Sequence, residues 1–177
     1  MDDRVVETKR IALGGGCFWC SEAIFKMLDG VKTTPGYAGG TTQNPTYEQV
    51  CSGTTGHAEV IMLEYDPTIA LLEKILDIFF KMHDPTQVNR QGNDIGAQYR
   101  SIILYTTEAQ KKVIEGFISD LQKKAPARIM TEVRKLGAFY QAEEYHKDYF
   151  KRNPANPYCI FVIRPKVSKI KKEFPEL

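Results

Sequence analysis

The sequence predicts an α+β fold in which helices pack on a sheet as a two-layer sandwich. Three observations lead to this class: segments with strand and helix periodicity alternate loosely, two long polar loops interrupt them, and no repeat, linker or low-complexity stretch is present. A doubly wound α/β fold is the second choice. The length of 177 residues fits one domain, residues 1–177, with a core over about 11–174.

Apolar spacing and turn residues define the elements of the first half of the chain. They predict, in order, a strand over 10–13, a helix over 17–28, a strand over 31–37, one helical turn over 47–51 within the polar loop 38–55, and a strand over 57–65. Three glycines after the first strand allow a tight turn before the helix, and Asp29-Gly30 ends that helix. The strand over 57–65 is apolar on both faces at its centre, which indicates an interior strand.

The second half is read in the same way. It predicts a helix over 71–82, a polar loop over 85–98, a strand over 99–105, a helix over 108–123, a strand over 129–135, a helix over 139–149, a strand over 159–164 and a basic helix or tail over 166–174. Asp84-Pro85 and Asn153-Pro154 end the helices that precede them. The partly polar alternation of residues 129–135 is typical of a strand near a sheet edge.

Charge and composition exclude several classes of protein. With 24 basic against 22 acidic residues, the surface lacks the excess of positive charge that nucleic acid attracts. No window is long and apolar enough to span a membrane, and the N-terminal residues are acidic where a secretion leader needs basic ones. Only four cysteines are present, so we expect a reducing, cytoplasmic compartment and not a disulfide-stapled secreted protein. We expect the protein to be a monomer.

Two cysteines three residues apart open the first predicted helix. Unpaired N–H groups and the positive end of the helix dipole favour a thiolate at Cys17, which is therefore the candidate nucleophile. Residues i and i+3 are neighbours on a helix and can be bridged with little backbone movement. Cys20 can therefore resolve an oxidised Cys17.

Other interpretations of these cysteines stay open at this level. Both thiols could pack in the core as small apolar side chains, or form a thioredoxin-like redox motif, although a clear βαβ unit is missing. A third interpretation is a structural zinc site in which Cys51 and His57 are further ligands. The spacing is weak evidence for such a site, because no second close cysteine pair exists.

Six motifs in order make the sequence recognisable. They are Gly15-Gly16-Cys17-Phe18-Trp19-Cys20, Gly36-Tyr37-Ala38-Gly39-Gly40, Asn44-Pro45-Thr46-Tyr47, Gly56-His57-Ala58-Glu59-Val60, Asp94-Ile95-Gly96-Ala97-Gln98-Tyr99-Arg100-Ser101 and Ala142-Glu143-Glu144-Tyr145-His146. Together they resemble the peptide methionine sulfoxide reductase A family. The resemblance implies reduction of methionine S-sulfoxide, free or in proteins damaged by oxidative stress, on a ferredoxin-like scaffold. It implies no metal and no organic cofactor.

Glu59 is the candidate proton donor. Sulfoxide oxygen leaves sulfur poorly unless it is protonated during attack, so an acid that is still protonated near neutrality is required. Glu59 stands at the head of an apolar strand, where desolvation raises a glutamate pKa from about 4.3 towards neutrality. The resemblance assigns the role of acid to this residue.

The resemblance also implies a substrate pocket. Tyr47 and Tyr99 match the family tyrosines whose hydroxyls hold the sulfoxide oxygen, and Asp94 matches the aspartate beside them. Phe18 and Trp19 match the aromatic pocket for the S-methyl group, and aromatic rings do favour such contacts. Without the resemblance, these tyrosines read as packing residues and Asp94 as a turn residue.

The recycling thiol is the open point of the expected cycle. Attack by Cys17 leaves a sulfenic acid, which condenses with a second thiol to a disulfide that a thioredoxin-type dithiol reduces. Many family members have a glycine at the position of Cys20 and carry a recycling cysteine in a glycine-rich tail. We favour Cys20 over Cys159, which precedes an apolar run, and read Cys51 as a buried structural thiol. The alternative function is a general thiol–disulfide oxidoreductase.

Overall fold

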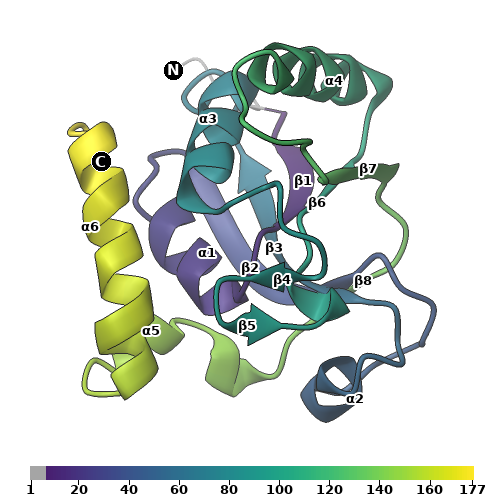
Figure 1. Cartoon of the computed structure of the whole chain (residues 1–177), viewed down its shortest axis with the longest axis vertical. Coiled ribbons are helices and arrows are strands. Elements are labelled where there is room, and N and C mark those ends of the chain that lie inside the picture. The colour runs from purple at the N-terminus through teal and green to yellow at the C-terminus, as the bar shows by residue number, and fades with distance from the viewer. Residues whose placement is uncertain (1–6) are drawn as a thin grey trace, which may run out of the picture.

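The computed structural model describes residues 7–177 (Figure 1). Part of the acidic N-terminal segment, from which we expect no secretion leader, lies outside these residues. The strands are β1 (Lys9–Gly14), β2 (Val31–Ala38), β3 (Ala58–Tyr65), β4 (Arg90–Gln91), β5 (Asp94–Ile95), β6 (Ile102–Tyr105), β7 (Glu132–Lys135) and β8 (Phe139–Gln141). The α-helices are α1 (Phe18–Phe25), α2 (Tyr47–Cys51), α3 (Leu72–Met82), α4 (Glu108–Gln122), α5 (Tyr149–Arg152) and α6 (Arg164–Glu173).

A six-stranded sheet in the order β7-β6-β1-β3-β2-β8 forms one layer of the described part of the chain. All its neighbouring strands are antiparallel except β6 and β7. Its four central strands, with α1 after β1 and α3 after β3, make the βαββαβ arrangement of a ferredoxin-like fold. As the apolar pattern predicts, β3 is interior, and β7 lies at an edge.

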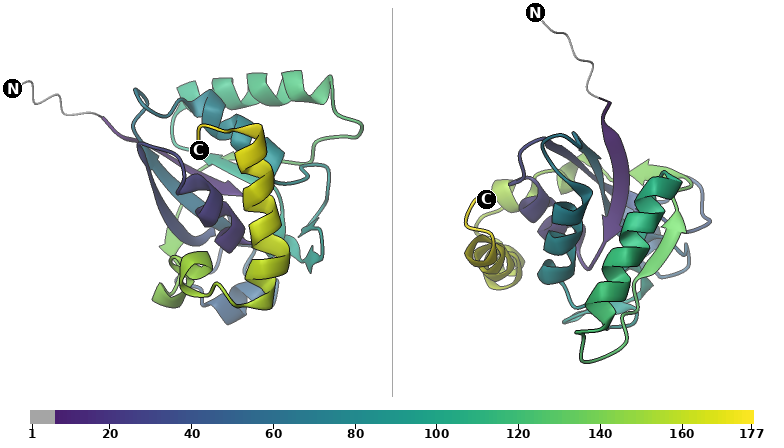
Figure 2. Two further views of the ribbon diagram at one scale, coloured as in Figure 1. Left: turned by 90° about the vertical axis from the view of Figure 1, so that its left-hand side faces the viewer. Right: turned by 90° about the horizontal axis from the view of Figure 1, so that it is seen from above.

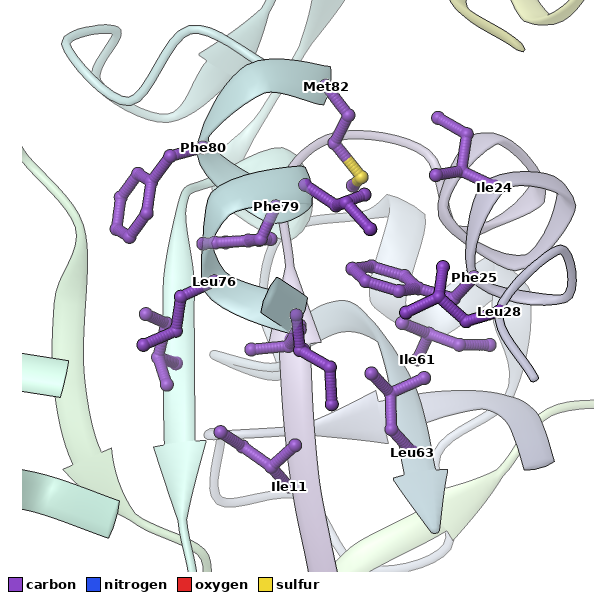
Figure 3. Packing of buried hydrophobic residues seen from close by; sticks show 14 of the residues in the cluster. Ile11, Ile24, Phe25, Leu28, Ile61, Leu63, Leu76, Phe79, Phe80 and Met82 are labelled. Atoms are coloured by element: carbon purple, nitrogen blue, oxygen red, sulfur yellow. The ribbon is translucent and has the colours of Figure 1, made fainter. Parts of the chain in front are cut away.

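Helices α1, α3, α4 and α6 form the second layer. Seen from above in Figure 2, α6, α3 and α4 lie side by side on one side of the sheet. Side chains alternate across a strand, so Ile11 and Leu13 of β1 face this helical layer while Ala12 faces the opposite side. Figure 3 shows the resulting core, in which Phe25 of α1 and Phe79 of α3 are fully buried. The expected two-layer α+β sandwich is confirmed.

The predicted strand over 159–164 is wrong, because this segment is helical. A π-helical turn over Cys159–Ile163 continues directly into α6. Buried side chains recur here at the spacing of a helix, namely Cys159, Ile163, Ile170 and Phe174. Phe161 lies between them and is 77% exposed, which a short apolar run read in isolation does not reveal. Helix and interior strand cannot be separated by composition over so few residues.

The predicted helix over 139–149 is also wrong. Phe139–Gln141 pairs with β2 as edge strand β8, and a 3-10 turn over Glu144–His146 follows it. The Phe139 ring lies across Gly36, where any side chain would collide with it at 2.4 Å. Asp148 adopts a left-handed φ of 55°, which interrupts helical geometry before α5. The spacing of four apolar residues therefore reflected three short elements and the loop between them, not one helix.

Smaller departures concern the second polar loop. It contains the two-stranded hairpin of β4 and β5, which its polar sequence does not predict. Tyr99 lies in a 3-10 turn, so the following strand begins at Ile102 and not at residue 99. Within residues 7–177, the helices are all too short or too polar to cross a bilayer.

Candidate active site

The first helix and the third strand meet at a glycine turn. A side chain on Gly14 would come within 2.9 Å of the Glu59 carbonyl oxygen, so glycine lets the end of β1 approach β3 closely. Gly16 has a φ of 96°, a conformation that L side chains rarely adopt. These two glycines deliver Cys17 to the N-cap of α1, directly against Glu59. The glycine turn predicted from the sequence therefore places Cys17 at the start of α1.

Cys17 and Cys20 form a buried, reduced pair. Both thiols are free, lie at the start of α1 and are in hydrogen-bonding contact with each other. Burial, followed by the Cys20 contact and the Glu59 carboxylate, raises the pKa of Cys17 well above its usual value, although the backbone N–H of Trp19 lowers it. The contact with Cys17 lowers the pKa of Cys20, and Lys166 acts in the same direction. The thiolate expected at Cys17 is thus a thiol in the resting site.

Glu59 is the buried acid of this site. Its side chain is 1% exposed, and burial raises its pKa to about 8, with the neighbouring Asp94 adding to the rise. The backbone N–H of Phe18 donates to Glu59 Oε2 at 3.1 Å, which holds the carboxyl group beside Cys17 and limits the increase in pKa. Glu59 is therefore protonated at neutral pH, as its apolar strand predicts.

Burial of a protonated Glu59 has a consequence for stability. The folded state keeps this proton up to about pH 8, whereas the unfolded chain loses it near pH 4.5, so folding becomes less favourable as pH rises between these values. Glutamine does not titrate, so the unfolding free energy of Glu59→Gln lacks this decline. The difference in unfolding free energy between Glu59→Gln and the native protein should therefore grow by a few kcal/mol in favour of the variant as pH rises from about 4.5 to about 8. Urea unfolding of both proteins across that range measures the difference, and a constant difference would contradict the raised pKa.

Tyr47 and Tyr99 reach the same acid from two polar loops. Burial is the main cause that raises the pKa of each phenol, and the Glu59 charge is the next. Both hydroxyls are therefore protonated donors at neutral pH. Thr46 caps α2 through a reciprocal capping box with Gln49, which fixes Tyr47 at the start of that helix.

Asp94 is held by a residue that the sequence did not single out. The hydroxyl of Tyr158, from the C-terminal segment, donates to Asp94 Oδ2 at 2.6 Å. Tyr158 also contacts the Cys20 thiol and the edge of the Trp19 indole. Its position in the sequence, next to Cys159, carried no signal because the surrounding segment resembled a strand.

Phe18 and Trp19 lie within an aromatic cluster. Phe18 is almost completely buried against Tyr37 and His146, with ring centroids 5.8 and 4.9 Å away. Trp19 is half-buried and stacks on Tyr149 at 3.6 Å with an interplanar angle of 4°. The structure therefore brings together every residue that the sequence predicts for this site, and adds Tyr37, His146 and Tyr149, to which it assigned no role.

The remaining cysteines differ from the expectation in part. Cys51 is exposed on α2 and contacts the Tyr47 hydroxyl, so its reading as a buried structural thiol is wrong; the short helix leaves it on the outer side. Cys159 is fully buried in the same cluster as Cys17 and Cys20, and burial raises its pKa. Within residues 7–177, no group of three side chains has the geometry to hold a metal ion, so Cys51 and His57 do not complete a zinc site.

A comparison with known families decides what this site belongs to. Residues 9–177 match the sequence profile of the family described as "Peptide methionine sulfoxide reductase". The chain belongs to this family. The methionine sulfoxide reductase of Saccharolobus solfataricus is 52% identical over 93% of both chains, and that of Nautilia profundicola is 54% identical over 92% of this chain and 94% of its own.

Solved structures of methionine sulfoxide reductases agree with the fold. Reduced Mxr1 of Saccharomyces cerevisiae is 35% identical, with a TM-score of 0.82 over 88% of this chain and 91% of that one. Methionine sulfoxide reductase A of Corynebacterium diphtheriae is 36% identical, with a TM-score of 0.77 over 88% of this chain and 79% of that one. These similarities confirm the resemblance and the ferredoxin-like α+β architecture that it implies.

Proposed function

We propose that Cys17 and Glu59 carry the reaction of this methionine sulfoxide reductase. The Cys17 sulfur attacks the sulfoxide sulfur as Glu59 protonates the oxygen; the S–O bond breaks, the oxygen leaves as water with the thiol proton, and Cys17 is joined to the substrate through an S–S bond. Water then attacks the Cys17 sulfur, the S–S bond breaks to release methionine, and the proton that this water loses restores Glu59 to its acid form. Thiol and sulfoxide are thereby converted to a sulfenic acid on Cys17 and a thioether, with no net change in protons. The observation that carries this proposal is the protonated, 1% exposed Glu59 held against the start of α1.

The raised pKa of Cys17 fits this order of events. A carboxylate at Glu59 would oppose ionisation of the neighbouring thiol, but below about pH 8 that carboxyl is neutral. Burial then remains the main factor that opposes ionisation of Cys17, whereas the backbone N–H of Trp19 stabilises the thiolate. We therefore expect the thiol proton to leave Cys17 together with the protonated sulfoxide oxygen, during attack and not before it.

The substrate pocket follows from the same side chains. We place the sulfoxide oxygen between the hydroxyls of Tyr47 and Tyr99, which face Glu59, and the S-methyl group against Phe18 and Trp19. Asp94 borders this pocket through its hydrogen bond to Tyr158. Fixed donors on one side and rings on the other distinguish the two epimers at sulfur.

With racemic free methionine sulfoxide, consumption should stop at half and leave the R epimer, whereas loss of both epimers would contradict the pocket.

Cys20 is the thiol we propose to resolve the sulfenic acid. It contacts Cys17 directly and its pKa is lowered, which favours the thiolate that attacks; Cys159 is completely buried and its pKa is raised. Condensation forms a Cys17–Cys20 disulfide and releases water. A thioredoxin-type dithiol then reduces that disulfide and is itself oxidised. The yeast protein Mxr1 has been solved in complex with Trx2.

Cys20→Ser should separate reduction from recycling. We expect one mole of methionine per mole of this variant and then no thioredoxin-supported turnover, because the sulfenic acid loses its partner. Cys159→Ser is the matched control and should keep cycling. Single-turnover and steady-state assays, with mass spectrometry of the product disulfide, measure both steps. Full cycling by Cys20→Ser together with its loss in Cys159→Ser would transfer the role to Cys159.

The setting of the reaction completes the proposal. The side chains of the site come from elements that run from α1 to the C-terminal segment of a single domain, and we expect the protein to be a monomer. Four free thiols support a reducing, cytoplasmic location. We expect the protein to repair oxidised methionine in proteins and to accept the free amino acid, without nucleic acid or membrane as a partner.

A further inference from the structure

His146 lies at the centre of the aromatic cluster, where the reaction gives it no role. Its side chain is fully buried in the 3-10 turn before α5. The imidazole packs against Phe18, Tyr47 and Tyr145, with ring centroids 4.9, 4.6 and 4.0 Å away. A histidine in such a place needs partners for its nitrogen atoms, because burial without them costs free energy.

The hydrogen bonds define the state of this ring. The indole Nε1–H of Trp19 donates to His146 Nδ1 at 3.0 Å, so Nδ1 carries the lone pair and the proton of the neutral ring is on Nε2. Within the described residues Nε2 has no hydrogen-bond partner, but Glu143 Oε2 lies 3.7 Å away. The Glu143 carboxylate favours a proton on that nitrogen. It is itself held, since Tyr37 and the Tyr47 backbone donate to it.

Trp19 is fixed almost entirely by the C-terminal segment. Tyr149 stacks on one face of the indole, and Tyr158 meets it edge-on at 5.8 Å. Stacking holds the plane of the indole but is compatible with a flip of the ring about χ2, which would turn the N–H to the opposite side. The bond from the indole N–H to His146 Nδ1 favours one of these two orientations.

We propose that His146 is a positioning residue that orients Trp19 in the substrate pocket. In its Nε2–H form it accepts the indole N–H and so fixes the wall against which the S-methyl group packs. This inference rests on the proposed function only in assigning that wall to Trp19. It predicts that His146 affects binding of the methyl group and its discrimination from larger groups, not the chemistry at Cys17.

Two variants separate the hydrogen bond from the volume of the ring. His146→Phe keeps an aromatic ring but removes the acceptor, while His146→Asn places an amide oxygen close to the position of Nδ1. We expect KM for methionine sulfoxide to rise about fivefold in His146→Phe, as for loss of one hydrogen bond of ~1 kcal/mol, with kcat changed less than about twofold. The preference for methyl over ethyl sulfoxides should fall, and His146→Asn should restore both.

Fluorescence tests the contact without any turnover. Trp19 is the only tryptophan in the sequence, so the emission spectrum reports on this indole alone. Emission should shift in His146→Phe and return towards native in His146→Asn. His57→Phe is the matched control, because His57 is equally buried but bonds to Gly40 and Thr42; its emission maximum should be unchanged. An unshifted spectrum in His146→Phe would overturn the inference.

A double-mutant cycle tests whether His146 acts through Trp19. Trp19→Phe removes the indole N–H, so adding His146→Phe to it should raise KM no further. Additive effects in folded proteins, checked by circular dichroism, would show that His146 acts independently of Trp19 and overturn the proposal. Failure of the proposed function would instead appear as turnover that survives Cys17→Ser, which leaves the fluorescence result intact. The two failures are therefore distinguishable.

Discussion

Cys17→Ser is expected to abolish reduction of methionine sulfoxide. A serine hydroxyl is a far weaker nucleophile than a thiolate and cannot form a sulfenic acid, so both halves of the cycle stop. The buried position at the N-cap of α1 accepts serine with little change in volume, so the fold should survive. Steady-state assays with thioredoxin and single-turnover assays without it should both fall below detection.

The matched control for this variant is Cys51→Ser. Cys51 is the exposed thiol of α2, and a serine there can keep the hydrogen bond to Tyr47. Turnover should stay within about twofold of native, as for most surface substitutions. Any steady-state turnover retained by Cys17→Ser, in protein shown by mass spectrometry to contain serine, would remove Cys17 as the nucleophile.

Glu59→Gln is expected to slow the reduction step by about 10²–10⁴-fold, the usual contribution of a general acid. In the native protein the acid form of Glu59 is lost as pH rises through about 8, so the rate should decline above that pH. Glutamine cannot donate a proton in this way, so the variant should lack that decline. Single-turnover rates between about pH 6 and pH 10 measure this alkaline decline directly.

Glu22→Gln serves as the control for a buried carboxyl. Glu22 is also on the helix that carries the cysteines, and burial also raises its pKa, but its Oε2 accepts from the backbone N–H of Asp148. The alkaline decline should persist in this variant. An unchanged pH profile in Glu59→Gln would show that a group other than Glu59 titrates near pH 8 and supplies the proton.

Periodicity predicted the elements that rest on long, regular patterns. The amphipathic spacing of α3 and α4 and the apolar centre of β3 each reflect one continuous face, so their position and burial follow from local sequence. The same reasoning failed over residues 139–164, where elements are three to five residues long. Such short pieces are decided by what they pack against, such as Phe139 across Gly36, and not by propensity.

For the candidate site, too, some features follow from local sequence and others only from tertiary packing. The sequence by itself determined the family through its motifs, and it predicted the groups that we propose for the chemistry: a cysteine pair at a helix start and an acid on an apolar strand. Tertiary structure alone decided how these groups are held, because Tyr158, Tyr149 and His146 come from a segment more than 120 residues away from Trp19. Local patterns report which face of an element is buried. They carry no information about which distant ring or hydroxyl will meet it, since that depends on how the whole chain packs.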